Sequence, residues 1–290
     1  MSFEPMRIAV LGVGLMGAGI ASLLADAGHN VTAWDVRADA LAELKAAFPR
    51  IATTPDLATA VGSAQVVMEA IAENLAAKHA VYASISAINA TCIVASNTSS
   101  LSASLLASGL SSPERFAIAH FFNHPRIVPL VEVVPAEHTS EETLETLRAM
   151  LDHAGKLPVI LRKEVPGFVA NRLQAAMYRE AFALAEEGVA SFEDIDLIVR
   201  GALGSRWAAA GPMTVVDAAG LDIWQAVMTQ LYPLLSNVTE APAAIREAVE
   251  RGELGAKTGK GLYGHTKEQD QALRDRIGEH FNLEFPAVPK

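Results

Sequence analysis

The chain has 290 residues, of which 51% are hydrophobic and 19% are charged. This composition excludes a disordered or low-complexity protein, and the length suits about two domains. Thirty-three acidic residues against 23 basic ones give a formal net charge of −10, which argues against non-specific binding of nucleic acid. A single cysteine, Cys92, excludes a disulfide framework and a cysteine-rich metal site and suits a reducing compartment.

The first residues, Met1–Pro5, lack the basic and apolar regions of a signal peptide. Elsewhere the apolar runs end well short of the roughly 18–20 residues that a membrane span needs. We therefore expect a cytoplasmic protein that crosses no membrane.

Residues 7–163 alternate short apolar segments with alanine-rich helical segments. The predicted strands are, in chain order, Arg7–Leu11, Val31–Asp35, a short one near Arg50–Thr53, Ala64–Ala70, Cys92–Ser96, Phe116–His120, Val131–Val134 and Leu157–Leu161. The helices predicted between them are Gly17–Ala27, Ala40–Phe48, a short one near Asp56–Val61, Leu75–Asn89 and Glu141–Ala154. Strands that are apolar throughout and alternate with helices are typical of a parallel sheet covered on both faces. We expect a doubly wound α/β domain.

The segment Val165–Gly167 ends this alternation, and helical patterns without a convincing strand follow it. Helices are expected at Phe168–Glu187, Glu193–Leu203, Pro212–Ala218 and Ala243–Arg251. Their apolar residues occur on several sides, which predicts an all-helical domain that also buries surface against a second subunit. With the boundary placed near Glu164, the domains are residues 1–164 and 165–290.

A glycine-rich turn opens the fold. The first predicted strand runs directly into Gly12-Val13-Gly14-Leu15-Met16-Gly17, and a helix follows. In this arrangement the glycines permit a tight turn, a close approach to a pyrophosphate and close packing of helix on strand, and the helix N-terminus offers free N–H groups to phosphates. A glycine-rich turn without a ligand is the alternative.

The second predicted strand strengthens the case for a dinucleotide. It ends in Asp35, which lies 18 residues after Gly17, close to the spacing of about 20 expected for an acid that binds ribose hydroxyls. Its charge would repel a 2′-phosphate and favours NAD over NADP, and Arg37 nearby keeps NADP open as the alternative. The predicted cofactor contacts in this region are Gly12, Gly14, Leu15, Met16, Gly17 and Asp35.

Polar residues also follow or interrupt the later strands. The run Ser96–Ser100 comes at the end of one predicted strand, His120 ends the next, and Glu132 lies inside the one after. Ligands bind at the carboxyl ends of strands in such sheets. The run is also typical of a helix N-cap, and we expect one of its residues to cap a helix. A lone His or Glu at such a place is more often a satisfied core residue, but together His120 and Glu132 suit a general base whose tautomer is held by a carboxylate. No spacing of histidines or acids predicts a metal.

Taken together, the motifs resemble the L-3-hydroxyacyl-CoA dehydrogenase family over nearly the whole chain. The segments that carry the resemblance, in the order of the family, are Gly12–Gly17, Glu69–Asn74, Ser96–Ser100, His120–Asn123, Leu130–Val134, Val165–Arg172, Gly211-Pro212 and Gly252–Tyr263. The resemblance implies a Rossmann-type domain followed by a helical dimerisation domain. It also implies NAD-dependent oxidation of a secondary alcohol at carbon 3 of an acyl group.

The resemblance further implies roles for single residues. His120 is the expected base and Glu132 its orienting partner. Residues expected to act with them in catalysis or to contact the substrate are Ser99, Asn123 and Asn171. Residues expected to line the cofactor are Glu73, Lys78 and Asn97.

Two departures from the family concern the substrate. Relatives that take CoA thioesters carry a helical hairpin after the second strand, and the segment from Asp35 to Val66 is too short for one. In addition, Ser205-Arg206-Trp207 resembles the Arg-aromatic pair of relatives that act on free hydroxy acids, such as carnitine and gulonate dehydrogenases. A guanidinium can bind a free carboxylate through two hydrogen bonds. The alternatives are a structural salt bridge or helix C-cap for Arg206 and packing for Trp207.

A third departure is His124, which stands where the family usually has proline. We favour a small free 3-hydroxy acid as the substrate, with an L-3-hydroxyacyl-CoA thioester as the alternative. A different class, a non-catalytic NAD-binding protein, is disfavoured because it would have no chemical reason to keep His120, Glu132, Ser99 and Asn171 together.

Overall fold

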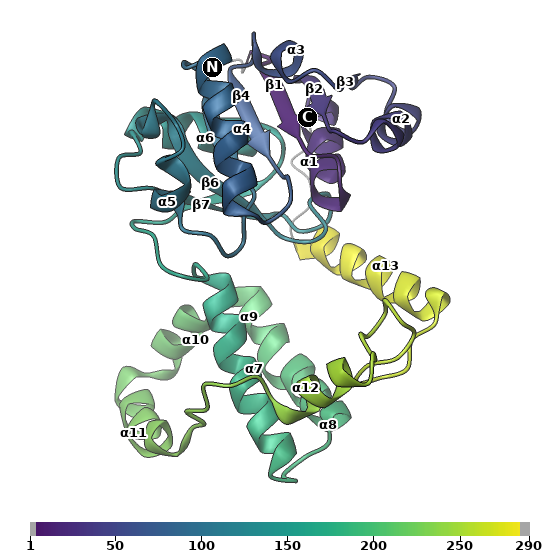
Figure 1. Ribbon diagram of the computed structural model, residues 1–290. Coiled ribbons are helices and arrows are strands. Elements are labelled where there is room, and N and C mark those ends of the chain that lie inside the picture. Colours follow the sequence, from purple (N-terminus) through teal and green to yellow (C-terminus); the bar gives the residue numbers. More distant parts are fainter. Residues whose placement is uncertain (1–3, 285–290) are drawn as a thin grey trace. The chain divides into compact units, whose positions relative to one another are not determined.

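The computed structural model describes residues 4–284 (Figure 1). It divides into two compact units, the first ending at Phe168 and the second running from Val169 to Glu284. The division therefore follows the Val165–Gly167 turn, a few residues beyond Glu164.

An eight-stranded sheet forms the centre of the first unit, in the spatial order β3-β2-β1-β4-β5-β6-β7-β8. The strands are β1 (Arg7–Leu11), β2 (Asn30–Trp34), β3 (Ala52–Thr54), β4 (Val66–Glu69), β5 (Ile93–Ser96), β6 (Phe116–Phe121), β7 (Leu130–Pro135) and β8 (Leu157–Ile160). Every neighbouring pair is parallel except β6 and β7, which are antiparallel. All eight predicted strands are confirmed, with ends that differ by one or two residues.

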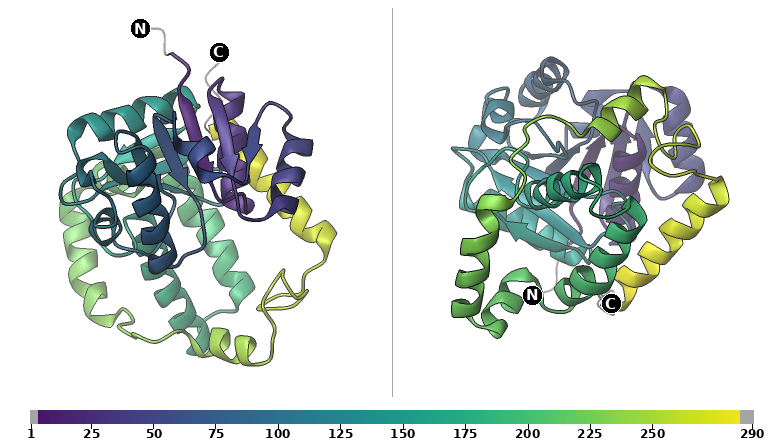
Figure 2. Two further views of the ribbon diagram at one scale, coloured as in Figure 1. Left: turned by 45° about the horizontal axis from the view of Figure 1, so that its top comes forward. Right: turned by 90° about the horizontal axis from the view of Figure 1, so that it is seen from below.

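Helices cover both faces of the sheet, as Figures 1 and 2 show. They are α1 (Leu15–Asp26), α2 (Ala38–Ala47), α3 (Leu57–Val61), α4 (Leu75–Ile88), α5 (Ala103–Ala107) and α6 (Glu141–His153), with a 3₁₀ turn at Pro113–Arg115. Side chains of α1, α2 and α6 pack in one hydrophobic core, and those of α3, α4 and α5 pack in another. Successive residues of β1 alternate between the two cores, because neighbouring side chains of a strand point to opposite faces. The doubly wound, Rossmann-type prediction is confirmed.

The order of the strands reverses between β1 and β4, which lie side by side. At such a switch point the loops after the two strands diverge to opposite faces and leave room for a ligand at the carboxyl ends. The glycine-rich turn follows β1, and residues 70–74 follow β4, so both lie at this position.

The polar run after β5 does not cap a helix, contrary to the prediction. Thr98 Oγ1 accepts hydrogen bonds from the backbone N–H of Ser100 at 3.3 Å and of Leu101 at 3.0 Å, so the run closes into a turn. The N-cap of α5 is Ser102, whose Oγ accepts from Leu105 N at 3.2 Å.

The second unit consists of helices. They are α7 (Ala170–Glu186), α8 (Phe192–Ile198), α9 (Ser205–Ala210), α10 (Pro212–Ala219), α11 (Leu221–Leu231), α12 (Ala243–Glu250) and α13 (Lys267–Glu284), with a 3₁₀ turn at Tyr232–Leu234. A π-helix, Val199–Gly204, joins α8 to α9 without a break. Between residues 169 and 284 the only β contacts are isolated bridges. The all-helical prediction is confirmed, although α9, α11 and α13 were not predicted.

Few side chains are buried within the second unit. Among its described residues only Ala248 is buried, whereas Leu234 is 78% and Met213 73% exposed. Helices α11 and α13 also carry exposed leucines and isoleucines. The unit therefore does not bury its apolar faces by itself. No helix within residues 4–284 is long and apolar enough to cross a membrane.

Candidate active site

The glycine-rich turn is shaped by close backbone contacts. Gly12 has φ +84°, and a Cβ on it would lie 2.7 Å from Ala70 O. A Cβ on Gly17 would lie 1.8 Å from Gly12 O, so the start of α1 packs directly on the end of β1. Around Gly14, by contrast, nothing lies within 4 Å of an added Cβ. The protein's own packing requires the outer two glycines, and the open space at Gly14 fits the approach of a pyrophosphate to the helix N-terminus.

Asp35, immediately after β2, fastens this turn. Its carboxylate accepts a hydrogen bond from Val13 N at 2.8 Å and another from Arg37 N at 2.9 Å. The Arg37 guanidinium also lies 3.5 Å from the carboxylate. Asp35 is 7% exposed, so its carboxylate sits at the edge of the open space rather than in bulk solvent.

Leu15 and Met16 begin α1 beside the open space at Gly14. Leu15 is 61% exposed in the first turn of the helix, and Met16 is half-buried against the first core. An exposed leucine at this position leaves an apolar surface next to the free N–H groups of the helix.

His120 and Glu132 face each other across the antiparallel pair β6–β7, where they are register partners. Nδ1 of His120 lies 2.9 Å from Oε2 of Glu132, and the two residues are 4% and 2% exposed. The short distance assigns the proton to Nδ1, which donates to the carboxylate, so Nε2 of the neutral ring is the acceptor. The rings of Phe122 and Phe168 pack on the imidazole, with centroid distances of 4.7 and 5.3 Å. The arrangement is a buried, oriented imidazole with one nitrogen available for a proton.

The predicted polar residues after β5 and β6 are brought to the same edge of the sheet. Asn97 Oδ1 accepts from Phe121 N at 2.9 Å, which joins the loop after β5 to the strand that carries the histidine. Ser99 and Asn123 are exposed. His124, next to Asn123, accepts backbone hydrogen bonds from the N–H groups of residues 127 and 128 and so begins a turn.

Glu73 and Lys78 occupy different environments. The Glu73 side chain is 39% exposed, whereas that of Lys78 is 1% exposed. The Lys78 ammonium lies 2.6 Å from Glu69 Oε1 and 3.5 Å from Glu73 Oε2. Lys78 therefore lies beneath the loop and does not line an open surface, which differs from its predicted place against the cofactor.

Hydrogen bonds hold the Glu73 carboxylate in its charged form. Burial alone would raise its pKa, but hydrogen bonds from Thr98 and Ser100 and the nearby Lys78 ammonium outweigh burial, and the pKa of Glu73 is lowered. The Ser100 Oγ donates at 2.9 Å, and the Thr98 Oγ1 donates to the same oxygen.

Sequence reasoning missed Glu69 and the aromatic neighbours of His120. Glu69 ends β4, Phe122 follows β6, and Phe168 lies in the turn after Val165. A signal for Glu69 was present, because it is a charged residue at the end of an apolar strand. Asp35 and His120, which were singled out, stand at similar places in or next to apolar strands. Phe168 has φ +52°, an uncommon conformation for a bulky residue that the sequence does not reveal.

Two predicted substrate residues belong to the second unit. Asn171 lies in the first turn of α7, and Arg206 lies in α9 just after the π-helix. Arg206 Nε donates to Ala202 O at 2.7 Å, so part of its guanidinium is bound to its own helix. No ion pair of Arg206 occurs within the described part of the chain. Trp207 beside it is 37% exposed.

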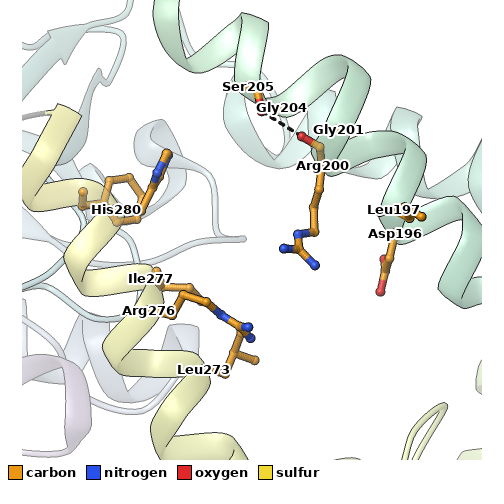
Figure 3. Close-up of a pocket in the computed structure, with 11 residues that line it drawn as sticks. Asp196, Leu197, Arg200, Gly201, Gly204, Ser205, Leu273, Arg276, Ile277 and His280 are labelled. Atoms are coloured by element: carbon orange, nitrogen blue, oxygen red, sulfur yellow. Dashed lines mark hydrogen bonds between the residues drawn. The ribbon is translucent and has the colours of Figure 1, made fainter.

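An open pocket of about 800 Å³ lies in the second unit between the α8–α9 helix and α13 (Figure 3). Its lining is mostly apolar, and it also contains two guanidinium groups, those of Arg200 and Arg276. None of the predicted catalytic residues lines it. Across residues 4–284 no group of three or more His, Cys, Asp or Glu side chains could hold a metal ion.

Comparisons with known proteins identify the family. The family models for 3-hydroxyacyl-CoA dehydrogenase match residues 7–48 and 42–165 for the NAD binding domain and residues 167–265 for the C-terminal domain. The chain is 37% identical to 5-formyl-3-hydroxy-2-methylpyridine 4-carboxylate 5-dehydrogenase of Mesorhizobium japonicum, over 92% of this chain and 93% of that protein. It is 33% identical to L-carnitine dehydrogenase of Streptomyces griseus, over 93% of this chain and 88% of that protein.

Solved structures agree with this assignment. A crystal structure of the 5-formyl-3-hydroxy-2-methylpyridine 4-carboxylic acid 5-dehydrogenase, described as an NAD⁺-dependent dismutase, matches with a TM-score of 0.91 at 33% identity, covering 98% of this chain and all 100% of that one. The 3-hydroxyacyl-CoA dehydrogenase of Archaeoglobus fulgidus matches with a TM-score of 0.73 at 31% identity, covering 96% and 98%. The chain belongs to the 3-hydroxyacyl-CoA dehydrogenase family, as its motifs predicted. It is an NAD-dependent oxidoreductase.

Substitutions of Gly14 and Gly17 should have different effects, one on NADH binding and the other on stability. Gly17→Ala should lower the free energy of unfolding, because the new methyl group meets Gly12 O at 1.8 Å. Gly14→Ala should change that free energy by less than about 1 kcal/mol but raise the dissociation constant of NADH at least about tenfold, because the methyl group occupies the pyrophosphate's approach. Urea denaturation and NADH fluorescence titration measure the two effects. Unchanged NADH binding by Gly14→Ala would contradict the assignment of this space to the cofactor.

Proposed function

We propose that this NAD-dependent dehydrogenase oxidises the 3-hydroxyl of a small free hydroxy acid to a ketone, with His120 as the general base. The observation that carries the proposal is the buried His120–Glu132 pair, 2.9 Å apart, at the edge of the sheet where ligands bind in this fold. A buried pair of this kind fixes which imidazole nitrogen accepts a proton and where it points.

In the proposed mechanism, Nε2 of His120 takes the proton of the substrate hydroxyl while carbon 3 loses a hydride. Glu132 accepts from Nδ1–H throughout and stabilises the imidazolium that forms. NAD, when bound, supplies the acceptor for the hydride. Ser99, Asn123 and Asn171 bind the substrate oxygens and orient carbon 3. The rings around the imidazole exclude water, which strengthens the interaction of Glu132 with the charged base.

We assign the binding of NAD to the residues around the switch point. Gly12, Gly14 and Gly17 with the N-terminus of α1 hold the pyrophosphate, and the open space at Gly14 supports this. Asp35 accepts from the adenosine ribose, and its negative charge disfavours a 2′-phosphate at this position. The remaining contacts on the cofactor side come from Leu15, Met16, Glu73 and Asn97, with Lys78 acting through Glu73.

Three observations support a free acid over a CoA thioester. The segment between β2 and β4 holds only α2 of 10 residues, the strand β3 and α3 of 5 residues, which leaves no helical hairpin to contact CoA. Arg206 forms no ion pair within the described residues, so the charge of its guanidinium is not compensated by an acid there. Two relatives are named for a pyridine carboxylate and for L-carnitine, which are not CoA thioesters.

His120→Ala should lower kcat by about 10²–10⁴-fold, because the base is removed, and should leave the dissociation constant of NADH unchanged. Steady-state kinetics with the best free hydroxy acid and NADH titration measure the two quantities. His138→Ala, at an exposed histidine of the same unit, serves as the control and should keep wild-type kcat. Full activity of His120→Ala would remove the proposed base.

Arg206→Ala should raise KM for a free hydroxy acid at least about tenfold, because a charge-assisted hydrogen bond contributes about 1.5–3 kcal/mol. The methyl ester of the same acid should show a much smaller change, since it lacks the carboxylate charge. Arg200→Ala, one helical segment earlier and also exposed, is the matched control. Unchanged kinetics of Arg206→Ala would show that the arginine has a structural role only.

We further propose that the protein is a homodimer formed through its second unit. The support is the near absence of buried side chains there, together with exposed apolar residues such as Met213 and Leu234. A helical unit of this kind needs a partner surface, and a symmetric second copy is the commonest one. Light scattering should give twice the chain mass of 30.7 kDa, and a monomer at micromolar concentration would contradict the proposal.

The compartment we propose is the cytoplasm. Cys92, the single cysteine, is buried and forms no disulfide, which suits a reducing environment. Fractionation of the source cells tests this, and recovery in an oxidising compartment would contradict it.

A further inference from the structure

A cluster of four buried side chains lies beneath the loops that follow β4 and β5. We call it the Glu69 cluster, and it consists of Glu69, Lys78, Tyr82 and Ser96, each no more than 1% exposed. Lys78 Nζ donates to Glu69 Oε1 at 2.6 Å, while Tyr82 OH and Ser96 Oγ donate to Oε2 at 2.6 and 2.7 Å. The backbone N–H of Ile71 adds a fourth donor at 2.8 Å. The Glu69 carboxylate is thus fully hydrogen-bonded and locked in place.

The donors come from three separate parts of the chain. Ile71 belongs to the loop after β4, Lys78 and Tyr82 belong to α4, and Ser96 ends β5. The Glu69 carbonyl also accepts from Asn97 N at 2.7 Å. Glu69 therefore fastens the beginning of both loops to the same helix.

The same two loops carry residues assigned to the cofactor. Glu73 lies in the first loop and is bound by Thr98 and Ser100 of the second. The Lys78 ammonium lies between the two carboxylates, with its Nζ 2.6 Å from Glu69 Oε1 and 3.5 Å from Glu73 Oε2. A buried carboxylate thus orients the lysine, and the lysine orients the half-exposed carboxylate that faces the cofactor side.

Stability alone is a weak reason for such a cluster. Taking two charges out of water is costly, and apolar residues of similar volume often replace a buried ion pair with no loss of stability. The neighbouring positions of the sheet are filled by apolar side chains such as Met68 and Val94. Apolar side chains at the positions of the Glu69 cluster would therefore also suit the fold. The cluster lies directly under the two loops.

We propose that Glu69 is a positioning residue for the cofactor site. It sets the geometry of the two loops, and through Lys78 it sets the position of the Glu73 carboxylate, so that the loops are ordered before NAD binds. This inference rests on the proposed assignment of Glu73 and Asn97 to the cofactor. Residues that are ordered in advance lower the entropic cost of binding.

The test uses the full-length enzyme and compares Glu69→Gln, Lys78→Met and the double variant, with NADH fluorescence titration and urea denaturation as readouts. Glu69→Gln removes the nearest counter-charge of the buried Lys78 ammonium and leaves it only Glu73, at 3.5 Å, so the urea midpoint should fall and the NADH dissociation constant should rise at least about tenfold. In the double variant both charges are gone, so the urea midpoint should recover while the raised dissociation constant persists. Ser96→Ala removes one tie to the second loop, keeps both charges and should raise the dissociation constant in a stably folded protein.

Lys156→Met is the matched control, because Lys156 is a second lysine of the first unit that is 5% exposed, and its Nζ donates to Val128 O at 2.9 Å. Its NADH dissociation constant should remain that of the wild type. If NADH affinity recovers together with stability in the double variant, or if all variants bind NADH like the wild type, the positioning role is overturned. A wild-type enzyme that binds NADH but oxidises no hydroxy acid would overturn the proposed substrate. The comparison of NADH dissociation constants among the variants would still test the positioning role.

Discussion

The reversal of strand direction between β6 and β7 is the constraint on which the proposed catalytic centre depends. In a sheet whose other pairs are parallel, this antiparallel pair makes His120 and Glu132 direct register partners. A slip of one residue would turn Glu132 to the opposite face of the sheet. A buried carboxylate is costly unless it is hydrogen-bonded, and Nδ1 of His120 supplies such a bond to Glu132. The pair therefore requires the register, and the register orients the imidazole at the edge where the parallel strands end.

Three carboxylates in or next to strands organise the site. Asp35 after β2 holds the glycine-rich turn through Val13 N, Glu69 at the end of β4 holds the loop through Ile71 N, and Glu132 in β7 holds the imidazole. Each acid is at most 7% exposed, and each accepts at least one hydrogen bond from the part that it holds. Glu69 and Glu132 thus support residues proposed to touch NAD or substrate, while Asp35 both holds the turn and is itself proposed to contact NAD.

Much of this arrangement could be predicted from the sequence. Apolar runs mark the strands, the glycines after β1 mark the turn, and polar residues at strand ends mark the edge that binds ligands. The burial of Lys78 and the Glu69 cluster could not be predicted, because their hydrogen bonds join loops and a helix whose contacts no local pattern encodes. Helix α13 is rich in charged residues and has a weak apolar face, so the sequence shows no clear helical periodicity there. The cap of α5 fell outside the polar run because Thr98 closes that run into a turn of its own.

In the proposed function, the buried and oriented His120 removes the proton of a hydroxyl group, and that hydroxyl belongs to a substrate that is a free acid. The most direct measurement is NADH formation by the wild-type enzyme, followed by absorbance, with L-3-hydroxybutyryl-CoA and with a panel of free 3-hydroxy acids under identical conditions. We expect turnover of at least one free acid and little or none of the thioester. Turnover of the thioester alone would contradict it, because CoA would then bind without a helical hairpin and Arg206 would have no carboxylate to recognise.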